Sequence, residues 1–515
     1  MEVIYQIYPL SFLDTNNDGV GDLKGIIKKL DYFEKLGVDY LWLTPVFSSP
    51  MEDNGYDISD YYNINPIFGT KDDLKDLIHL AKKKNIKIIL DLVLNHTSIE
   101  HFWFKEACEN INSKYHDYYI WSDKKTDIIS IFGGSAWEYI PKINKYYLHM
   151  FSKGQADLNW KNKHLREELY KMINYYIDLG VGGFRLDVLD LIGKDLENNN
   201  LYNRDLLNKY LNELNDRCFR GKDNIFTVAE MNLPLEIAQK LSEQNILTTI
   251  FQFDHIALDE VAGMGKWELK PLKLNDLKIT LNRFQQAYHK GGMPSLFWSN
   301  HDQPRALGRY LNLDYRYYGQ TMLFMLMYLQ KGHIFIYQGE EFGMSGLGYV
   351  DISVYKDIEA INYYNEAIKT KPKEAILKSL SVKARDHSRT PMQWDDTQYA
   401  GFSKVKPWID VNSNYLSVNF KKDYHSENSI YLFLKELLEI KANNETLKKG
   451  SFKLIDFGEN IFAYERVLDE NYLIVCNFLD KELKITNISG KIILNNYNDF
   501  NNKLKPYQAL LFKRG

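Results

Sequence analysis

Short apolar runs alternate with longer amphipathic stretches along the first two thirds of the chain. The stretches 23–36, 72–84 and 165–179 repeat their apolar residues every three or four positions and predict helices, whereas the apolar runs predict buried strands. Strands that alternate with helices favour a parallel sheet, and eight of them favour an α/β fold closed into a (β/α)8 TIM barrel. The alternative, an open doubly wound sheet, would need a glycine-rich phosphate turn after the first strand, and the sequence has none there. The predicted strands are Ile4–Tyr8, Tyr40–Leu43, Ile86–Val93, Gly183–Asp187, Phe226–Glu230, Thr248–Gln252, Ser295–Asn300 and Ile334–Gln338.

Two departures from this pattern divide the chain into domains. Residues 97–162, rich in Tyr, Trp and His, are too long for a plain connection, so we expect an inserted subdomain over the barrel mouth. From about residue 451 the apolar positions alternate with a period of two, which predicts a C-terminal antiparallel β-sandwich. The predicted domains are a barrel (1–96 and 163–445), the inserted subdomain (97–162) and the sandwich (446–515). Residues 344–388 are expected to wall the same mouth.

Composition narrows the class of protein. The 515-residue chain has a net charge of −4, so nothing indicates binding to nucleic acid or to an anionic membrane. Its three cysteines are widely spaced and odd in number, which fits no disulfide framework or metal site. The longest apolar run, Met322–Leu329, is too short to span a bilayer, and the first residues lack the features of a signal peptide. We expect a cytoplasmic monomer with no membrane contact and no organic cofactor.

Charged side chains gather at the predicted carboxyl ends of the strands. Arg185 and Asp187 lie two apart in one buried strand, so they share a face, and buried charges are costly unless paired or used. Glu230 ends the following strand, and His301 and Asp302 come just after another. Working side chains of a TIM barrel lie at this rim, and two opposed carboxyl groups best serve glycoside hydrolysis. A structural ion pair would explain Arg185 and Asp187 alone, but not three carboxylates at one rim.

A loop near the N-terminus has the spacing of a calcium site. Oxygen-bearing residues stand at alternate positions, with a glycine after the third, and a backbone carbonyl would complete the set. The position at which an EF-hand supplies its bidentate Glu is Gly25, so a loop site is predicted rather than an EF-hand. A metal-free turn is the alternative. The predicted ligands of a structural Ca²⁺, with Mg²⁺ as the other candidate, are Asp14, Asn16, Asp18, Val20 and Asp22.

Nine motifs follow one another in a fixed order along the chain. They are Gln6–Pro9, Asp14–Leu23, Asn54–Tyr61, Asp91–Thr97, Gln155–Trp160, Phe184–Val188, Asn300–Arg305, Gln338–Glu341 and Arg389–Trp394. Together they resemble the α-amylase family of glycoside hydrolases, in its oligo-1,6-glucosidase and dextran glucosidase branch. The resemblance runs from end to end and implies a hydrolase of small oligosaccharides.

The resemblance also implies roles for individual residues. Asp187 would be the nucleophile that forms a β-glucosyl-enzyme, Glu230 the acid and then the base, and Asp302 the group that grips the ring hydroxyls. Such an acid needs a raised pKa and such a nucleophile a lowered one, and a retaining pair lies roughly 5–5.5 Å apart. The alternatives are core packing for Tyr56, a buried structural histidine for His96 and a sugar contact from Arg389 instead of Arg385. The implied substrate-binding residues are Tyr56 beneath the sugar, His96, Arg185 and His301 around it, and Asp57 and Arg385 at its non-reducing end.

The sequence leaves the scissile bond open. Val188 and Lys266 resemble residues that accompany α-1,6 preference, although such packing differences are worth only about 1–3 kcal/mol. Thr44, Ala156 and Leu186 instead match trehalose-6-phosphate hydrolases, but no cluster of Lys or Arg is visible for a phosphate. We favour isomaltose-type substrates, with trehalose 6-phosphate as the alternative. A non-enzymatic sugar-binding relative is the remaining alternative, and such a protein would have lost its carboxylates.

Overall fold

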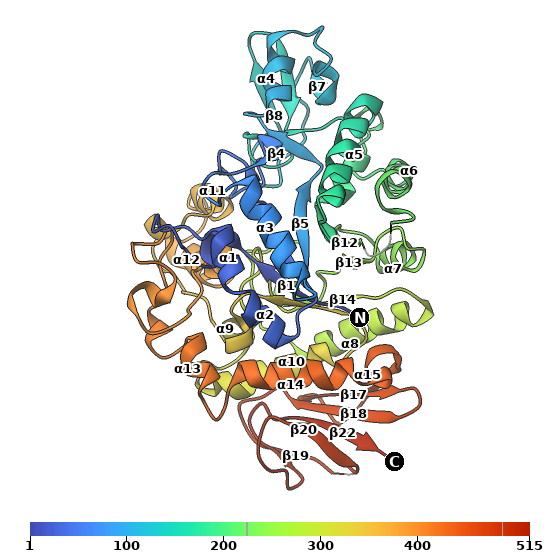
Figure 1. Cartoon of the computed structure of the whole chain (residues 1–515), viewed down its shortest axis with the longest axis vertical. Coiled ribbons are helices and arrows are strands. Elements are labelled where there is room, and N and C mark those ends of the chain that lie inside the picture. The colour runs from blue at the N-terminus through green and yellow to red at the C-terminus, as the bar shows by residue number, and fades with distance from the viewer. Residues whose placement is uncertain (223–224, 487) are drawn as a thin grey trace.

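The computed structural model describes residues 1–222, 225–486 and 488–515, and its centre is a barrel of parallel strands (Figure 1). The eight strands follow the order β13-β12-β11-β5-β2-β1-β15-β14. The two end strands meet where the Ser295 hydroxyl donates to the Ile250 carbonyl oxygen at 3.0 Å. The predicted TIM barrel is therefore confirmed. Its strands are β1 (Val3–Ile7), β2 (Tyr40–Leu43), β5 (Lys87–Val93), β11 (Gly183–Asp187), β12 (Phe226–Glu230), β13 (Thr249–Phe251), β14 (Ser295–Leu296) and β15 (His333–Tyr337).

Alternate residues of each strand face two different cores. In β1, Ile4 joins a cluster inside the barrel, whereas Tyr5 and Ile7 join the larger cluster shared with the helices. The inner cluster is strongly aromatic, with the rings of Trp42 and Phe251 stacked 5.5 Å apart. This two-sided burial explains why barrel strands read as continuous apolar runs in the sequence.

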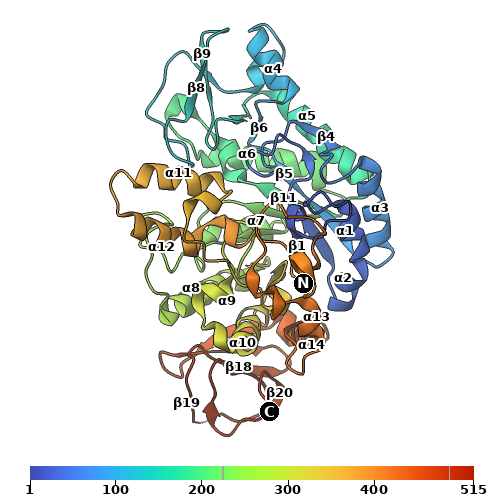
Figure 2. The ribbon, with the colours of Figure 1, turned by 90° about the vertical axis from the view of Figure 1, so that its left-hand side faces the viewer.

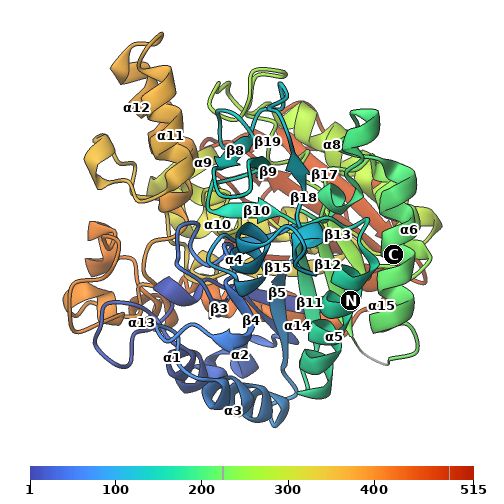
Figure 3. The same cartoon turned by 90° about the horizontal axis from the view of Figure 1, so that it is seen from above.

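Helices surround the barrel, as the view from above shows (Figure 3). The predicted helix over 23–36 is in fact two, because the backbone at Lys29 leaves the helical region (φ −106°, ψ 10°). The strand predicted over Ser295–Asn300 is only two residues long, because its pairing with β15 ends at Leu296. The surrounding helices include α1 (Leu23–Lys28), α2 (Leu30–Leu36), α3 (Lys71–Lys82), α5 (Lys163–Asp178), α6 (Arg204–Leu214), α7 (Leu235–Glu243), α8 (Leu274–Ala287) and α10 (Arg316–Tyr328).

The segment after β5 lies at one end of the long axis of the molecule and the C-terminal sheet at the other (Figures 1 and 2). Within this segment β6 and β10 pair antiparallel, and β7, β9 and β8 form a three-stranded sheet. Its position beyond the carboxyl ends of the barrel strands places it over the barrel mouth. The elements are β6 (His96–Ser98), α4 (Phe102–Glu109), β7 (Trp121–Ser122), β8 (Trp137–Ile140), β9 (Lys145–Leu148) and β10 (Gln155–Asp157).

The C-terminal sheet is five-stranded and antiparallel, in the order β16-β17-β18-β22-β20. One face packs on the barrel, where the Tyr464 hydroxyl donates to the Met325 carbonyl of α10 at 3.1 Å. The other face is covered by a core shared with the two-stranded sheet β19-β21, to which Ile485 and Leu504 contribute. The second layer of the sandwich is therefore small. The strands are β16 (Ser451–Ile455), β17 (Ile461–Val467), β18 (Asn471–Asn477), β19 (Leu483–Lys484), β20 (Lys491–Asn495), β21 (Lys503–Leu504) and β22 (Ala509–Arg514).

Two further helices, α11 (Ile358–Ala367) and α12 (Lys373–Lys383), follow the last barrel strand and pack on each other through their own apolar cluster. A third, α14 (Ile430–Ala442), lies between the barrel and the C-terminal sheet (Figure 1). In the part of the chain that the structure describes, no helix combines the length and apolarity needed to cross a membrane.

Candidate active site

Arg185 is the centre of the site, and three carboxylates from three neighbouring strands converge on it. Its Nη1 donates to Asp91 at 2.9 Å and to Asp187 at 2.6 Å, and its Nη2 donates to Glu230. Arg185 is paired in register with Asp91 of β5 and lies beside β12, which ends in Glu230. The side chain of Arg185 is only 2% exposed, so the desolvated guanidinium draws these carboxylates together strongly.

The carboxylates outnumber the positive charge that holds them. Burial raises the pKa of Asp187 well above its usual value, Arg185 opposes this, and Glu230 and Asp91 add to it. Burial likewise raises the pKa of Glu230 to about 6, against Arg185 and with Asp302 and Asp91. The raised pKa of Glu230 is that expected of an acid. The lowered pKa expected for Asp187 is not found, because burial raises it most and the Glu230 and Asp91 carboxylates add to this effect against the one guanidinium of Arg185.

Asp302 has the opposite environment. Burial alone would raise its pKa, but His301, Arg385 and Arg389 lower it well below the usual value. Arg389 Nη2 and Arg385 Nη1 donate to Asp302 Oδ1 at 2.8 and 3.3 Å. Asp302 is therefore held ionised, as a group that binds hydroxyls without exchanging protons should be.

His301 links this carboxylate to the floor of the site. Its Nδ1 accepts from the Gln6 amide at 2.7 Å, so Nε2 carries the hydrogen, and it lies 3.1 Å from Asp302. The Tyr56 hydroxyl lies 2.6 Å from the same Nε2, and the two rings stack at 5.4 Å. Tyr56 also donates to Asp91 at 2.9 Å. The Tyr56 hydroxyl thus has two polar partners, His301 and Asp91, which hold the ring in place where it lines the cavity.

These side chains enclose a small cavity of about 160 Å³. A cavity of about 150 Å³ accommodates one six-membered ring, so the space suits a single sugar unit rather than a chain. Burial lowers the pKa of His96 to about 4, so this histidine is neutral and lines the cavity as a hydrogen-bonding group. The lining residues are Asp53, Tyr56, His96, Phe132, Phe151, Gln155, Asp187, Val188, Glu230, Lys266, Asp302, Gln303, Glu359 and Arg385.

The prediction for Asp57 is wrong. Its carboxylate turns into its own loop, where it accepts from the Ser49 hydroxyl at 2.9 Å and from the Glu52 and Asp53 backbone N–H groups. Asp53 takes the expected place, with Oδ1 3.3 Å from Arg385 Nη2. The sequence signal that could have revealed this is the turn at Asn54 and Gly55, both with positive φ, which reverses the chain between the two aspartates.

Arg385 lines the cavity as predicted, whereas Arg389 lies behind it and donates to the His301 carbonyl at 3.0 Å. The guanidinium of Arg385 lies 5.4 Å from the centre of the Phe132 ring, which comes from the segment after β5. Lys266 also lines the cavity, with Nζ 2.5 Å from Glu359 Oε2. The segment 344–388 thus walls the mouth as expected. The lining residues that sequence reasoning missed are Asp53, Phe132, Phe151, Gln155, Gln303 and Glu359.

The loop predicted to bind calcium turns its oxygens onto its own backbone. Asp14 accepts from the N–H groups of Asn16, Asn17 and Gly19, Asp18 accepts from Val20, and Asp22 accepts from Thr15 and Gly25. Three carboxylates, an amide and a carbonyl suit Ca²⁺ chemically. Within residues 1–222, 225–486 and 488–515, however, no three acidic, His or Cys side chains converge as a metal site would require. The side chains as placed form a turn, and Ca²⁺ stays a prediction.

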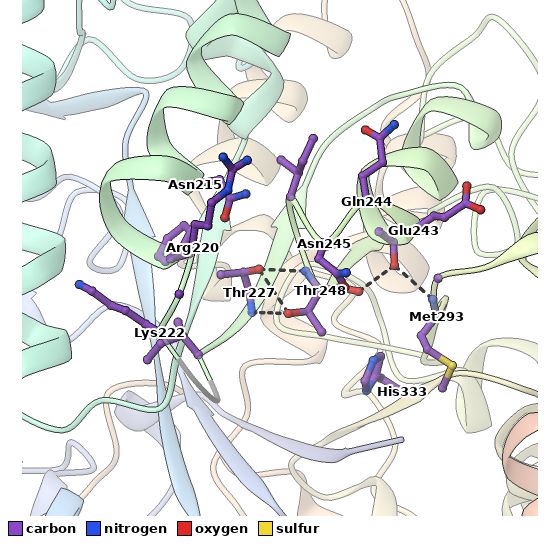
Figure 4. A pocket seen from close by; sticks show the side chains of 16 residues that line it. Asn215, Arg220, Lys222, Thr227, Glu243, Gln244, Asn245, Thr248, Met293 and His333 are labelled. Atoms are coloured by element: carbon purple, nitrogen blue, oxygen red, sulfur yellow. Dashed lines mark hydrogen bonds between the residues drawn. The ribbon is translucent and has the colours of Figure 1, made fainter.

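A larger cavity, about 540 Å³, lies at the other end of the barrel (Figure 4). There the Thr227 and Thr248 N–H groups donate to each other's hydroxyl oxygens at 3.1 and 2.9 Å, and His333 lies close by at the start of β15. This is the amino end of the strands, which in TIM barrels serves stability rather than chemistry. We therefore place the reaction at the carboxyl end.

Carboxylates at strand ends, gathered around one arginine in a cavity the size of one ring, are the arrangement of a TIM-barrel glycoside hydrolase. The family model described as "Alpha amylase, catalytic domain" matches residues 6–450. The chain belongs to the α-amylase family, as the sequence motifs predicted.

Curated and solved relatives cover nearly the whole chain. It is 46% identical over 498 residues to a glucan 1,6-alpha-glucosidase of Streptococcus pneumoniae, covering 95% of this chain and 93% of the relative. It is 41% identical over 549 residues to an oligo-1,6-glucosidase of Bacillus cereus, covering 99% and 98%. The crystal structure of trehalose-6-phosphate hydrolase from Bacillus licheniformis superposes with a TM-score of 0.93 at 38% identity, covering 99% and 98%. The enzyme class is thus shown.

Proposed function

We propose that this enzyme is a retaining, exo-acting α-glucosidase that releases terminal α-1,6-linked glucose from isomaltose-type oligosaccharides. The observation that carries the proposal is that Asp187 and Glu230 bind two different nitrogens of one guanidinium at a cavity sized for one sugar ring. Two carboxyl groups on either side of a glycosidic bond are what retaining hydrolysis needs.

The reaction has two displacements. In the reactive form of the enzyme Asp187 is ionised and paired with Arg185. It attacks the anomeric carbon while Glu230 gives its proton to the departing glycosidic oxygen, which leaves a β-glucosyl-enzyme. Glu230, now ionised, takes a proton from water, and that water breaks the ester and returns Asp187 and α-glucose. The pKa of Glu230, raised by burial to about 6, lets it be protonated in the first step and ionised in the second.

The outer end of the cavity supports exo action. Asp302, Asp53 and Arg385 form a charged wall, and Phe132 lies over Arg385. A sugar bonded to further units at its non-reducing end would meet this wall. The ionised Asp302 is suited to hydrogen-bond two ring hydroxyls, and those bonds strengthen as the ring flattens and gains positive charge.

The charges in the cavity favour an α-1,6 glucoside over trehalose 6-phosphate. A phosphate is bound best by Lys or Arg groups that are free to pair with it. Of the residues described as lining the cavity, the basic ones are Lys266 and Arg385; Lys266 is paired with Glu359, and Arg385 with Asp357, Asp53 and Asp302. The similarity to trehalose-6-phosphate hydrolase keeps that substrate as the second candidate. A non-enzymatic role is not supported, because all the carboxylates are present.

The deciding experiment is a hydrolysis panel of p-nitrophenyl α-glucoside, isomaltose, panose, maltose and trehalose 6-phosphate. We expect isomaltose and panose to be cleaved with the highest kcat/KM and the first sugar released to be α-glucose, as followed by NMR. If trehalose 6-phosphate alone is cleaved, the proposed α-1,6 specificity is wrong, but the retaining mechanism still holds. Release of β-glucose would overturn the mechanism itself.

Three finer properties are also proposals. Cys108, Cys218 and Cys476 are all unpaired, which supports a reducing, cytoplasmic location. The oxygen-rich donor set of the Asp14–Asp22 loop supports a structural Ca²⁺. Large apolar side chains are exposed at scattered places such as Tyr202, Val350 and Leu416, which supports a monomer, to be checked by light scattering.

A further inference from the structure

Asp357 is a fully buried carboxylate that stands directly behind the cavity wall. It is absent from the described cavity lining, yet its Oδ1 accepts from both Nε and Nη2 of Arg385, at 2.9 and 2.5 Å. The other partners of Arg385 are farther away, since its contacts to Asp53 and Asp302 are both 3.3 Å. Among these partners, Asp357 therefore makes the shortest hydrogen bonds to the Arg385 guanidinium.

The charge of Asp357 is maintained. Burial by itself would raise its pKa, but Arg385 and Arg389 lower it to about 2. Nε and Nη2 both donate to one carboxylate oxygen, which fixes the edge that the guanidinium turns toward Asp357. The remaining nitrogen of Arg385, Nη1, is thereby left to face Asp302 and the cavity.

Backbone hydrogen bonds in turn anchor Asp357. Asp357 is the N-cap of α11, and its side chain accepts from the Glu359 N–H at 3.3 Å. Its own N–H donates to Asp386, next to Arg385 in the chain, at 3.2 Å. The first turn of α11 and the turn that carries Arg385 are thus tied together at two points.

We propose that Asp357 is a positioning residue whose carboxylate sets the orientation in which Arg385 meets the non-reducing end of the bound glucosyl unit. This inference rests on the proposed function, because it takes the cavity to hold the terminal sugar. Without that carboxylate, Arg385 would turn toward Asp53 and Asp302 and withdraw hydrogen bonds that those groups offer to the sugar.

Asp357→Asn and Asp357→Ser test the proposal, since Asn and Ser both cap helices well and keep the turn of α11 while removing the charge. A displaced binding group can cost about 100-fold, so kcat/KM should fall by about that factor, mainly through KM, on p-nitrophenyl α-glucoside and isomaltose alike. The two substrates share the glucosyl unit and differ in the leaving group. Asp351→Asn, the same change at an exposed helix cap of the same segment, should leave both parameters unchanged.

A double-mutant cycle separates positioning from general damage. In an Arg385→Ala background, Asp357→Asn should lower kcat/KM by no more than about twofold, because the group through which it acts is gone. Additive losses, or a loss on isomaltose only, would overturn the proposal. If the wild-type enzyme cleaves no α-glucoside, the proposed function fails by itself, and the same cycle measured as glucose affinity by calorimetry still decides the role of Asp357.

Discussion

The residues around Arg185 show how unequal surroundings divide roles between like groups. Asp302 faces two guanidinium groups and a histidine and keeps its charge, whereas Glu230 shares one guanidinium with two other carboxylates. Asp and Glu are chemically near-identical, so the roles come from the environment rather than from the residue type.

Activity should depend on the protonation of Glu230. Because burial raises its pKa to about 6, the protonated acid is lost as the pH rises through that value, and kcat/KM for isomaltose should fall on the basic side. Glu230→Gln should abolish isomaltose hydrolysis but retain a first turnover of p-nitrophenyl α-glucoside, whose leaving group needs no proton. Asp187→Asn should remove both activities. If the activity of Glu230→Gln on p-nitrophenyl α-glucoside still falls at high pH as in the wild type, the assignment of that fall to Glu230 is wrong.

Val188, directly after Asp187, has a strained backbone. Its φ of 35° and ψ of 46° lie in the left-handed region, which a β-branched residue rarely adopts and which costs about 1–3 kcal/mol. Asn tolerates this region, so Val188→Asn should melt at no lower temperature than the wild type while losing preference for isomaltose over maltose. Val188→Thr, still β-branched, should gain no stability. A clear fall in melting temperature for Val188→Asn would show that the packing of Val188 outweighs its strain.

At the scale of elements, the end of α10 depends on two buried basic side chains from elsewhere in the chain. Lys441 of α14 donates to the Tyr328 and Gln330 carbonyls, both at 2.6 Å, and Arg466 of β17 donates to the Leu329 and Gly450 carbonyls, both at 2.7 Å. The Tyr328, Leu329 and Gln330 carbonyls lie at the C-terminus of α10, where the helix itself supplies no donors, whereas Gly450 lies directly before β16. The C-terminal sheet is thus bonded to the barrel through helix ends as well as apolar surface.

Arg466→Met should therefore lower the melting temperature. It leaves two buried carbonyl oxygens without donors, at about 1–3 kcal/mol each. Thermal unfolding followed by circular dichroism measures the loss. Lys435→Met, a change at a half-buried position of α14 that removes only the surface ion pair with Glu439, should stay within about 0.5 kcal/mol of the wild type. Equal melting temperatures for the two variants would mean that water replaces Arg466.

At the scale of the molecule, the barrel, the rim carboxylates and Arg385 were predictable, whereas the rest of the outer wall was not. Strand runs and strand-end charges are local in sequence, so period and spacing reveal them. Asp53 and Asp57 are both acidic and four residues apart, and only the fold of their loop decides which one meets Arg385. Phe132 and Glu359 come from segments more than two hundred residues apart, and no local pattern says that they share a cavity. The break at Lys29 likewise depends on tertiary packing, in which its ammonium lies 3.7 Å from the Trp394 ring centre.

Removal of divalent metal tests the Asp14–Asp22 loop, which the Ser403 hydroxyl ties to the distant segment near residue 403 by a bond to Asp14 at 2.6 Å. If Ca²⁺ binds there, EDTA should lower the melting temperature, and calcium at a hundred times its Kd should restore about 2.7 kcal/mol. Asp18→Ala should abolish that response. Identical melting curves in EDTA and in calcium would leave the loop as a metal-free turn.

The first strand of the barrel, β1, pairs on one side with β2 and on the other with β15. In the pairing with β15, Val3 lies beside Ile334, which is far along the chain. A ribosome adds about 5–20 residues per second, so β1 waits many seconds for its second neighbour to emerge. Until then its edge is open to any other strand in reach. Premature termination before β15 would therefore yield a chain prone to aggregate, and chaperone demand in the cell should be highest late in synthesis.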